Sequence, residues 1–133
     1  MRPILQVVVL AALLGAASAS ALAEAGRGLT PVAGAELRQR LPGAHLLFPE
    51  HGATPEFWEE FDPRGTWQLI GPRAPIVGRY RIVGDRFCVT LEATGKEICR
   101  QLLRDREGRL FASAWRSPNT MPERVEISKS PEP

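Results

Sequence analysis

Turn-forming sequences recur at short, regular intervals after residue 60, and the segments between them have the length of strands. The first turn is Asp62-Pro63-Arg64-Gly65, which has Asp, Pro and Gly at positions that a type I turn prefers. Turns about 8–12 residues apart are typical of antiparallel sandwiches and small barrels. Further turns are predicted at Gly71-Pro72, Gly84-Asp85, Ala93-Thr94-Gly95, Asp105-Arg106-Glu107-Gly108 and Ser117-Pro118-Asn119.

The segments between these turns are rich in β-branched, aromatic and aliphatic residues. Side chains alternate most clearly at Arg79–Ile82, which predicts Tyr80 and Ile82 in the core and the two arginines facing solvent or a cleft. We expect a mainly β protein, an antiparallel meander that forms a small barrel or an open curved sheet, lipocalin-like in outline. The predicted strands are Thr66–Ile70, Ile76–Val83, Arg86–Leu91, Glu97–Leu103 and Leu110–Trp115, with a weaker one at Val125–Ser128.

The two cysteines, Cys88 and Cys99, flank a predicted hairpin. If Glu92–Gly95 is a four-residue loop, Leu91 pairs with Lys96 and Cys88 falls opposite Cys99. Directly opposed residues of antiparallel strands are about 4.5–5.5 Å apart at Cα, within the range of a disulfide. The spacing does not match the common zinc, redox or haem motifs. We therefore predict a Cys88–Cys99 disulfide that links one hairpin.

One short amphipathic helix is expected before the meander. Thr30-Pro31 offers a cap and a first-turn proline, and Ala33, Leu37 and Leu41 recur at four-residue spacing until Pro42-Gly43. We expect this helix to cover one end or one face of the sheet.

The segment Thr54–Phe61 allows two interpretations. Thr54-Pro55-Glu56 is a plausible helix start, whereas Phe57, Glu59 and Phe61 alternate as in a strand, and we favour the strand. Neighbouring carboxylates on a strand point to opposite faces, so Glu59 and Glu60 do not fit a catalytic carboxylate pair. We expect them to belong to an acidic rim.

Three parts of the chain carry a resemblance: Phe61-x-Pro63-x-Gly65-Thr66-Trp67, the run Gly78-Arg79-Tyr80-Arg81-Ile82-Val83-Gly84-Asp85-Arg86-Phe87-Cys88, and Cys99. The pattern resembles a group of small, uncharacterised exported proteobacterial proteins, with Tyr80 where tryptophan is common. The resemblance covers about half of the chain that follows the predicted signal peptide. It implies an exported β-meander and transfers no catalytic residue.

The N-terminal segment has the features of a secretory signal peptide: Arg2, the apolar run Ile4–Leu14 and the small-x-small site Ala21-Leu22-Ala23. The apolar run is shorter than the roughly 20 residues of a spanning helix, which favours cleavage after Ala23 over retention as an anchor. We expect export by the general secretory route to the periplasm or beyond, with no membrane attachment afterwards. The predicted organisation is a signal peptide (1–23), a linker (24–29), one β-rich domain (30–116) and a C-terminal strand with a loose tail (117–133).

Almost every positive charge is an arginine, since the only lysines are Lys96 and Lys129. The net charge of +2 is too small for the broad field that nucleic-acid binding requires, so no nucleic-acid partner is expected. A guanidinium is a planar fork of donors that suits anions, although arginine bias also follows from a GC-rich genome. The candidate face for a small anionic ligand or an envelope protein consists of Arg79, Arg81, Arg86 and Arg100.

The aromatic residues Trp67, Tyr80 and Trp115 have two possible roles. They suffice to fill part of a small core, and the sharper hypothesis is that they line a ligand cavity open at one end of the sheet.

No nucleophile–base pattern is present, and we expect no enzyme activity, no cofactor and no metal. His45 lies beside three apolar residues, which predicts a strand or edge position. The main functional hypothesis is an exported binding or interaction module. The alternative is a small periplasmic enzyme or metal-binding protein that uses Glu50 and His51.

Overall fold

A computed structural model of the 133-residue chain describes residues 28–51, 56–113, 115 and 121–129. The predicted signal peptide, the turn at 117–119 and the C-terminal tail lie outside the described residues.

The described residues form one 10-stranded sheet in which every pairing is antiparallel. The order across the sheet is β1-β8-β9-β10-β2-β3-β4-β5-β6-β7. The mainly β antiparallel fold that the turn spacing predicts is therefore confirmed. The strands are β1 (Thr30–Pro31), β2 (Ala44–Leu47), β3 (Trp58–Phe61), β4 (Thr66–Ile70), β5 (Ile76–Val83), β6 (Arg86–Leu91), β7 (Glu97–Arg100), β8 (Leu102–Arg104), β9 (Leu110–Ala112) and β10 (Glu123–Lys129).

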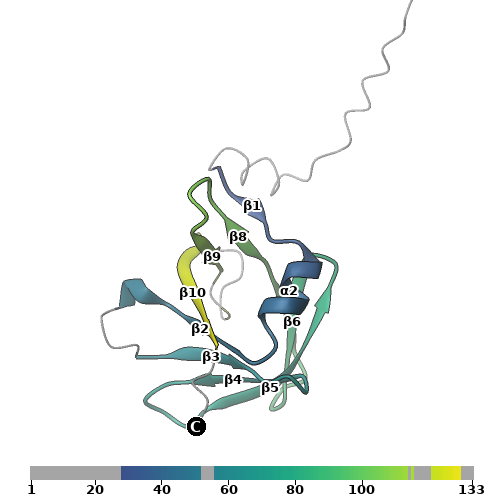
Figure 1. Cartoon of the computed structure of the whole chain (residues 1–133). Helices are drawn as coiled ribbons and strands as arrows, with labels where there is room; N and C mark the ends of the chain where they lie inside the picture. The colour runs from purple at the N-terminus through teal and green to yellow at the C-terminus, as the bar shows by residue number, and fades with distance from the viewer. Residues whose placement is uncertain (1–27, 52–55, 114, 116–120, 130–133) are drawn as a thin grey trace, which may run out of the picture.

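The sheet curls into a half-barrel (Figure 1). Strands β7 and β8 are far apart in the sheet order, yet only Gln101 separates them in the chain. The chain itself thus joins the two parts of the curled sheet at this corner. The C-terminal strand β10 lies between β9 and β2, so it is an internal strand of the same sheet. None of the helices in the described part is long and apolar enough to cross a membrane.

The predicted strands β4, β5 and β6 are confirmed with the expected bounds. The single strand predicted at Glu97–Leu103 is instead two strands, because the chain turns the corner of the half-barrel at Gln101. Strand β9 ends at Ala112, and β10 is longer than predicted. The ambiguous segment forms strand β3, although residues 54 and 55 are not described.

The predicted hairpin and its disulfide are confirmed. The amide of Leu91 donates to the carbonyl of Lys96, and Cys88 pairs with Cys99 in the register. Because hydrogen-bonded pairs alternate along an antiparallel ladder, the cysteines occupy a non-hydrogen-bonded pair, where side chains approach most closely. Their Cα atoms are 4.0 Å apart and their sulfur atoms are bonded.

The helix α2 (Gly34–Arg40) begins later than predicted. Thr30 and Pro31 pair with β8 instead of capping the helix, and Ala33 at the N-cap makes no side-chain cap bond. Asp85, from the β5–β6 turn, supplies the cap by accepting a 2.7 Å hydrogen bond from the Gly34 amide. A tertiary contact therefore replaces the local cap that the sequence pattern predicts.

The core lies inside the curl. Leu37 and Leu41 from the helical segment are fully buried, and burial of a leucine side chain contributes roughly 1.5–3 kcal/mol. Phe87 and Val89 belong to this core, and the predicted inward positions Tyr80 and Ile82 pack against it, as does Leu91. Aromatic rings meet edge-on within it, with Phe61 5.1 Å from Tyr80 and 5.8 Å from Phe87 between ring centroids.

Candidate functional site

An apolar pocket of about 660 Å³ lies within the half-barrel. Five large apolar side chains line it, and three exposed residues of the β4–β5 loop stand at its rim. Volume and lining are typical of a site for a small molecule. The apolar lining residues are Phe48, Phe57, Leu69, Ile76 and Trp115, and the loop residues are Pro72, Arg73 and Ala74.

Strand alternation directs these side chains inward. Leu69 on β4 and Ile76 on β5 are register partners, so they stand side by side on the inner face. Phe57 precedes β3 by one residue and its ring lies 5.1 Å from that of Phe48. Phe48 belongs to the buried core and Phe57 packs against it. The pocket is therefore an unfilled space that adjoins the core.

The described part of the lining also contains two charged residues. Arg73 is exposed in the β4–β5 loop, and no ion pair involving it occurs within the described part of the chain. Glu123 is the first residue of β10 and is partly buried. It shares one face of β10 with buried Val125, and it already has an interaction of its own within the protein.

A buried ion pair adjoins the pocket. Glu59 and Arg100 have side chains with 0% exposure, and they make two hydrogen bonds of 2.6 and 2.9 Å. Trp67 Nε1 donates to Glu59 Oε1 at 2.8 Å, and Arg100 Nε donates to the Ser113 carbonyl at 2.8 Å. The guanidinium carbon also lies 5.0 Å from the centre of the Phe87 ring.

The buried polar atoms of Glu59 and Arg100 have hydrogen-bond partners within the protein in place of water. Within the described residues, no buried side-chain nitrogen or oxygen lacks a hydrogen-bond partner. The pair connects to the pocket in two ways: Leu69, which lines the pocket, is the register partner of Glu59, and the Trp115 ring lies 6.0 Å from that of Trp67.

A partly exposed ion-pair network joins helix α2 to the sheet. Glu36 accepts hydrogen bonds from Arg104 on β8 and from Arg40 one helical turn away. The hydrogen bond from Arg104 is the main cause that lowers the pKa of Glu36, against the opposing effect of burial. The same hydrogen bond raises the pKa of Arg104.

The predicted arginine face is only partly formed. Arg79, Arg81 and Arg86 are exposed, as the alternation predicts, and Arg81 pairs with Glu97 at 3.0 Å. Arg100 is not on this face, because an inward position on β7 places it in the buried ion pair with Glu59. The expectation for Arg100 is therefore wrong.

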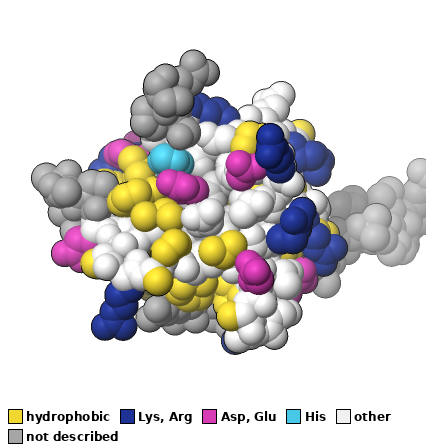
Figure 2. All heavy atoms as spheres, turned by 90° about the horizontal axis from the view of Figure 1, so that it is seen from below, with side chains coloured by type: hydrophobic (Ala, Val, Ile, Leu, Met, Phe, Trp, Pro, Cys, Tyr) yellow, Lys and Arg dark blue, Asp and Glu magenta, His cyan; other side chains and the backbone are white. Residues whose placement is uncertain are grey.

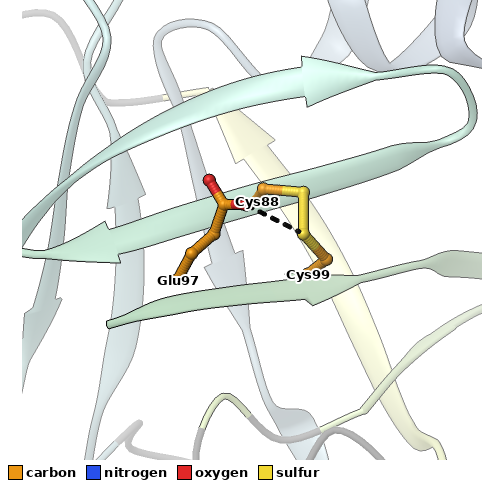
Figure 3. A group of neighbouring side chains, drawn as sticks. All are labelled: Cys88, Glu97 and Cys99. Atoms are coloured by element: carbon orange, nitrogen blue, oxygen red, sulfur yellow. Dashed lines mark hydrogen bonds between the residues drawn. A yellow bond between two sulfur atoms is a disulfide. The ribbon is translucent and has the colours of Figure 1, made fainter. Parts of the chain in front are cut away.

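The disulfide lies beside Glu97, whose side chain points toward it (Figure 3). Two sulfur atoms and a carboxylate oxygen within 4.8 Å of one another resemble a metal-binding group. Both sulfurs are bonded to each other, so neither is available as a thiolate ligand.

The predicted cavity lining holds for one residue of three. Trp115 lines the pocket, whereas Trp67 is fully buried and donates to Glu59. Tyr80 lies against Phe61, and its hydroxyl donates to the Asp62 carbonyl at 2.7 Å. Burial is the main cause that raises the pKa of Tyr80, and the Asp62 carboxylate adds to it.

The predicted acidic rim is wrong for Glu59, which points into the half-barrel, while its neighbour Glu60 is partly exposed on the outer face.

His45 lies in strand β2, which is internal to the sheet, and its Nε2 is 3.5 Å from Glu60 Oε1. Glu50 is exposed in the short helix η1 (Pro49–His51), and the side chain of His51 lies outside the described part.

The sequence predictions do not include the other lining residues. The alternation of Phe57, Glu59 and Phe61 contains the signal for Phe57, because it places all three on the inner face of β3. For Arg73 and Glu123 no sequence signal exists, since loop arginines and strand-end glutamates are common on any surface.

Figure 2 views the half-barrel from the side of β3, β4 and β5, where hydrophobic side chains gather in the middle of the outer surface. Leu47, Trp58 and Ile70 form one cross-strand row and are all half-buried, and Val77 is half-buried on β5. Trp58 Nε1 donates to Glu60 Oε1 at 3.0 Å. The outer face is therefore less polar than simple inside–outside alternation implies.

No known family model, curated protein or solved structure matches the chain.

Proposed function

We propose that this protein is an exported binding protein that holds a small, largely apolar molecule in the pocket of the half-barrel. The observation that carries the proposal is the lining of five large apolar side chains around about 660 Å³. A pocket of this size is within the range of about 300–1,000 Å³ that small-molecule sites occupy.

The physical argument concerns the apolar surface of the pocket. Phe57, Leu69, Ile76 and Trp115 are only partly buried, so their pocket faces contact water in the free protein. A bound apolar molecule would remove this surface from water at about 25 cal/mol per Å². Leu69 and Ile76 lie on paired strands that hold this part of the wall in place, which limits the ordering cost that binding must overcome.

Export is the second part of the proposal. It rests on the predicted signal peptide and gains support from the Cys88–Cys99 disulfide, because disulfides persist in oxidising compartments. The proposal assigns binding without catalysis. An arginine-bearing outer face formed by Arg79, Arg81 and Arg86 is compatible with it and would serve an envelope partner.

The test is a titration with the neutral fluorescent probe N-phenyl-1-naphthylamine, whose emission rises in apolar sites. The variant Ala74→Trp places an indole at the rim of the pocket, at an exposed loop position that tolerates a larger side chain. The matched control is Ala93→Trp, at an exposed position of the β6–β7 loop.

The unchanged protein and Ala93→Trp are expected to bind the probe saturably, and Ala74→Trp is expected to lose this binding while its circular dichroism spectrum stays the same. Unchanged probe affinity in Ala74→Trp would place the probe elsewhere and overturn the proposal. An unchanged protein that binds no probe would also overturn it.

A further inference from the structure

Among the described residues of the lining, one arginine, Arg73, stands at the rim beside apolar walls, and this arrangement defines a class of ligand. We infer that the ligand is a single-chain amphiphile whose apolar chain occupies the pocket and whose headgroup carries one negative charge at Arg73. This inference rests on the proposed function, because it concerns the same pocket.

The apolar part of the ligand follows from the walls. Phe48 and Trp115 come from the segments beside β2 and β9, and Leu69 and Ile76 come from β4 and β5, so apolar side chains surround the pocket from different parts of the curl. A polar group placed deep in this lining would lose its water without gaining a partner. The buried polar groups that adjoin the pocket already satisfy one another.

The polar part of the ligand follows from the rim. Arg73 is exposed, and within the described residues no carboxylate forms an ion pair with it. It stands between Pro72 and Ala74, with Pro75 next, in a loop whose prolines restrict the backbone. An anion at the rim would gain a charge-assisted hydrogen bond while keeping most of its hydration.

The choice of an anionic over a cationic headgroup follows from Glu123. This residue supplies the one carboxylate of the described lining, but it already has an interaction within the protein. A cationic headgroup would have to displace or share that interaction, whereas an anionic headgroup meets an available guanidinium. The nearby carboxylate also disfavours a headgroup with two negative charges, which favours a carboxylate over a doubly ionised phosphate monoester.

The experiment compares three ligands with the same chain length: decanoate and decyltrimethylammonium, each below its critical micelle concentration, and 1-decanol below its solubility limit. Displacement of N-phenyl-1-naphthylamine reports their affinities at pH 7 and low salt. Decanoate is expected to bind about two- to fivefold more tightly than decanol, as one exposed charge pair provides. Arg73→Gln is expected to remove this preference and leave the affinity for decanol unchanged.

Arg86→Gln is the matched control, because Arg86 is an exposed arginine of the outer face that the sequence predicted for anions. It should leave the affinity for decanoate unchanged. Equal binding of decanoate and decanol to the unchanged protein would overturn the anionic class and leave the proposed function intact. Tighter binding of decyltrimethylammonium would also overturn it and assign the headgroup to Glu123. If none of the three displaces a probe that the pocket binds, the amphiphile class is overturned, whereas the proposed function is overturned only by the probe titration with Ala74→Trp described above.

Discussion

The variant Arg100→Met tests the buried ion pair most directly. It removes a guanidinium whose side chain is 0% exposed, and it keeps an unbranched apolar side chain in the same place. Three interactions are lost: the bidentate pair with Glu59, the hydrogen bond to the Ser113 carbonyl and the contact with the Phe87 ring.

The expected loss of unfolding free energy follows from the interactions that Glu59 keeps in the variant. Glu59 keeps the hydrogen bond from Trp67 Nε1 but loses its counter-ion in a site with no access to water. Breaking a buried pair by removing one partner costs about 3–5 kcal/mol. A domain of this size has a free energy of unfolding of about 5–15 kcal/mol, so the single variant should lose a large fraction of its stability. Its Tm should fall by more than about 10 °C.

The assay is urea unfolding followed by far-ultraviolet circular dichroism at pH 7, with the disulfide intact. The double variant Glu59→Met, Arg100→Met removes both charges, and we expect it to recover most of the loss, because an apolar pair of similar volume carries no uncompensated charge. Arg81→Met is the matched control: Arg81 pairs with Glu97 at the surface, so its loss should cost less than about 1 kcal/mol.

Two results would refute the reasoning. A loss in Arg100→Met no larger than that in Arg81→Met would mean that water reaches the carboxylate of Glu59. A double variant less stable than Arg100→Met alone would mean that the Glu59 carboxylate stabilises the fold even without its counter-ion, through the hydrogen bond from Trp67.

Three further outcomes are expected. Tyr80 is the single tyrosine of the chain, so absorbance at 295 nm should give a folded-state midpoint above the ordinary value of about 10 and a midpoint near 10 in urea. Because the pKa of Tyr80 is higher in the folded protein, the contribution of Tyr80 to stability is present below pH 10 and decreases as the pH rises above 10. A folded midpoint equal to or below the midpoint in urea would contradict this prediction. Serine at both Cys88 and Cys99 should lower the free energy of unfolding in urea by about 3 kcal/mol relative to the protein with its disulfide intact, and the reduced parent protein, as the control, should match the variant. Gly34→Ala should destabilise the protein by more than about 1 kcal/mol in urea unfolding, because its Cβ would lie 2.0 Å from the Gly84 carbonyl oxygen, whereas Ala35→Gly should cost only the ordinary helix penalty of about 1 kcal/mol or less.

The local parts of the fold could be predicted from the sequence. Strands β4, β5 and β6 follow from side-chain alternation between turns, and the register of the β6–β7 hairpin follows from the length of one loop. In each case the partners lie close together in the chain, so few alternative pairings compete. The same reasoning explains why Cys88 and Cys99 were placed correctly.

The long-range parts could not be predicted. The alternation with Phe57 and Phe61 indicates the face on which Glu59 lies, but Arg100 is 41 residues away, and nothing in either local sequence identifies the two as partners. Thr30 has the local features of a helix cap, but pairing with β8 and the Asp85 cap from a distant turn override them. The pocket has the same origin, because its walls come from segments between Phe48 and Glu123.

The buried ion pair and the pocket are connected through strand β3. Along its inner face, Phe61 lies in the packed core, Glu59 forms the ion pair and Phe57 lines the pocket. Arg100 comes from β7, close to the corner at Gln101, so the pair links strands that are not hydrogen-bonded neighbours. Its polar atoms must keep their partners, which restricts how far Trp67 and the nearby walls can move inward. An apolar pair would have no such directional requirement, and the core side chains would be freer to fill the empty space. The charges therefore favour a half-barrel that is packed on the Phe61 side of the ion pair and hollow on the Phe57 side.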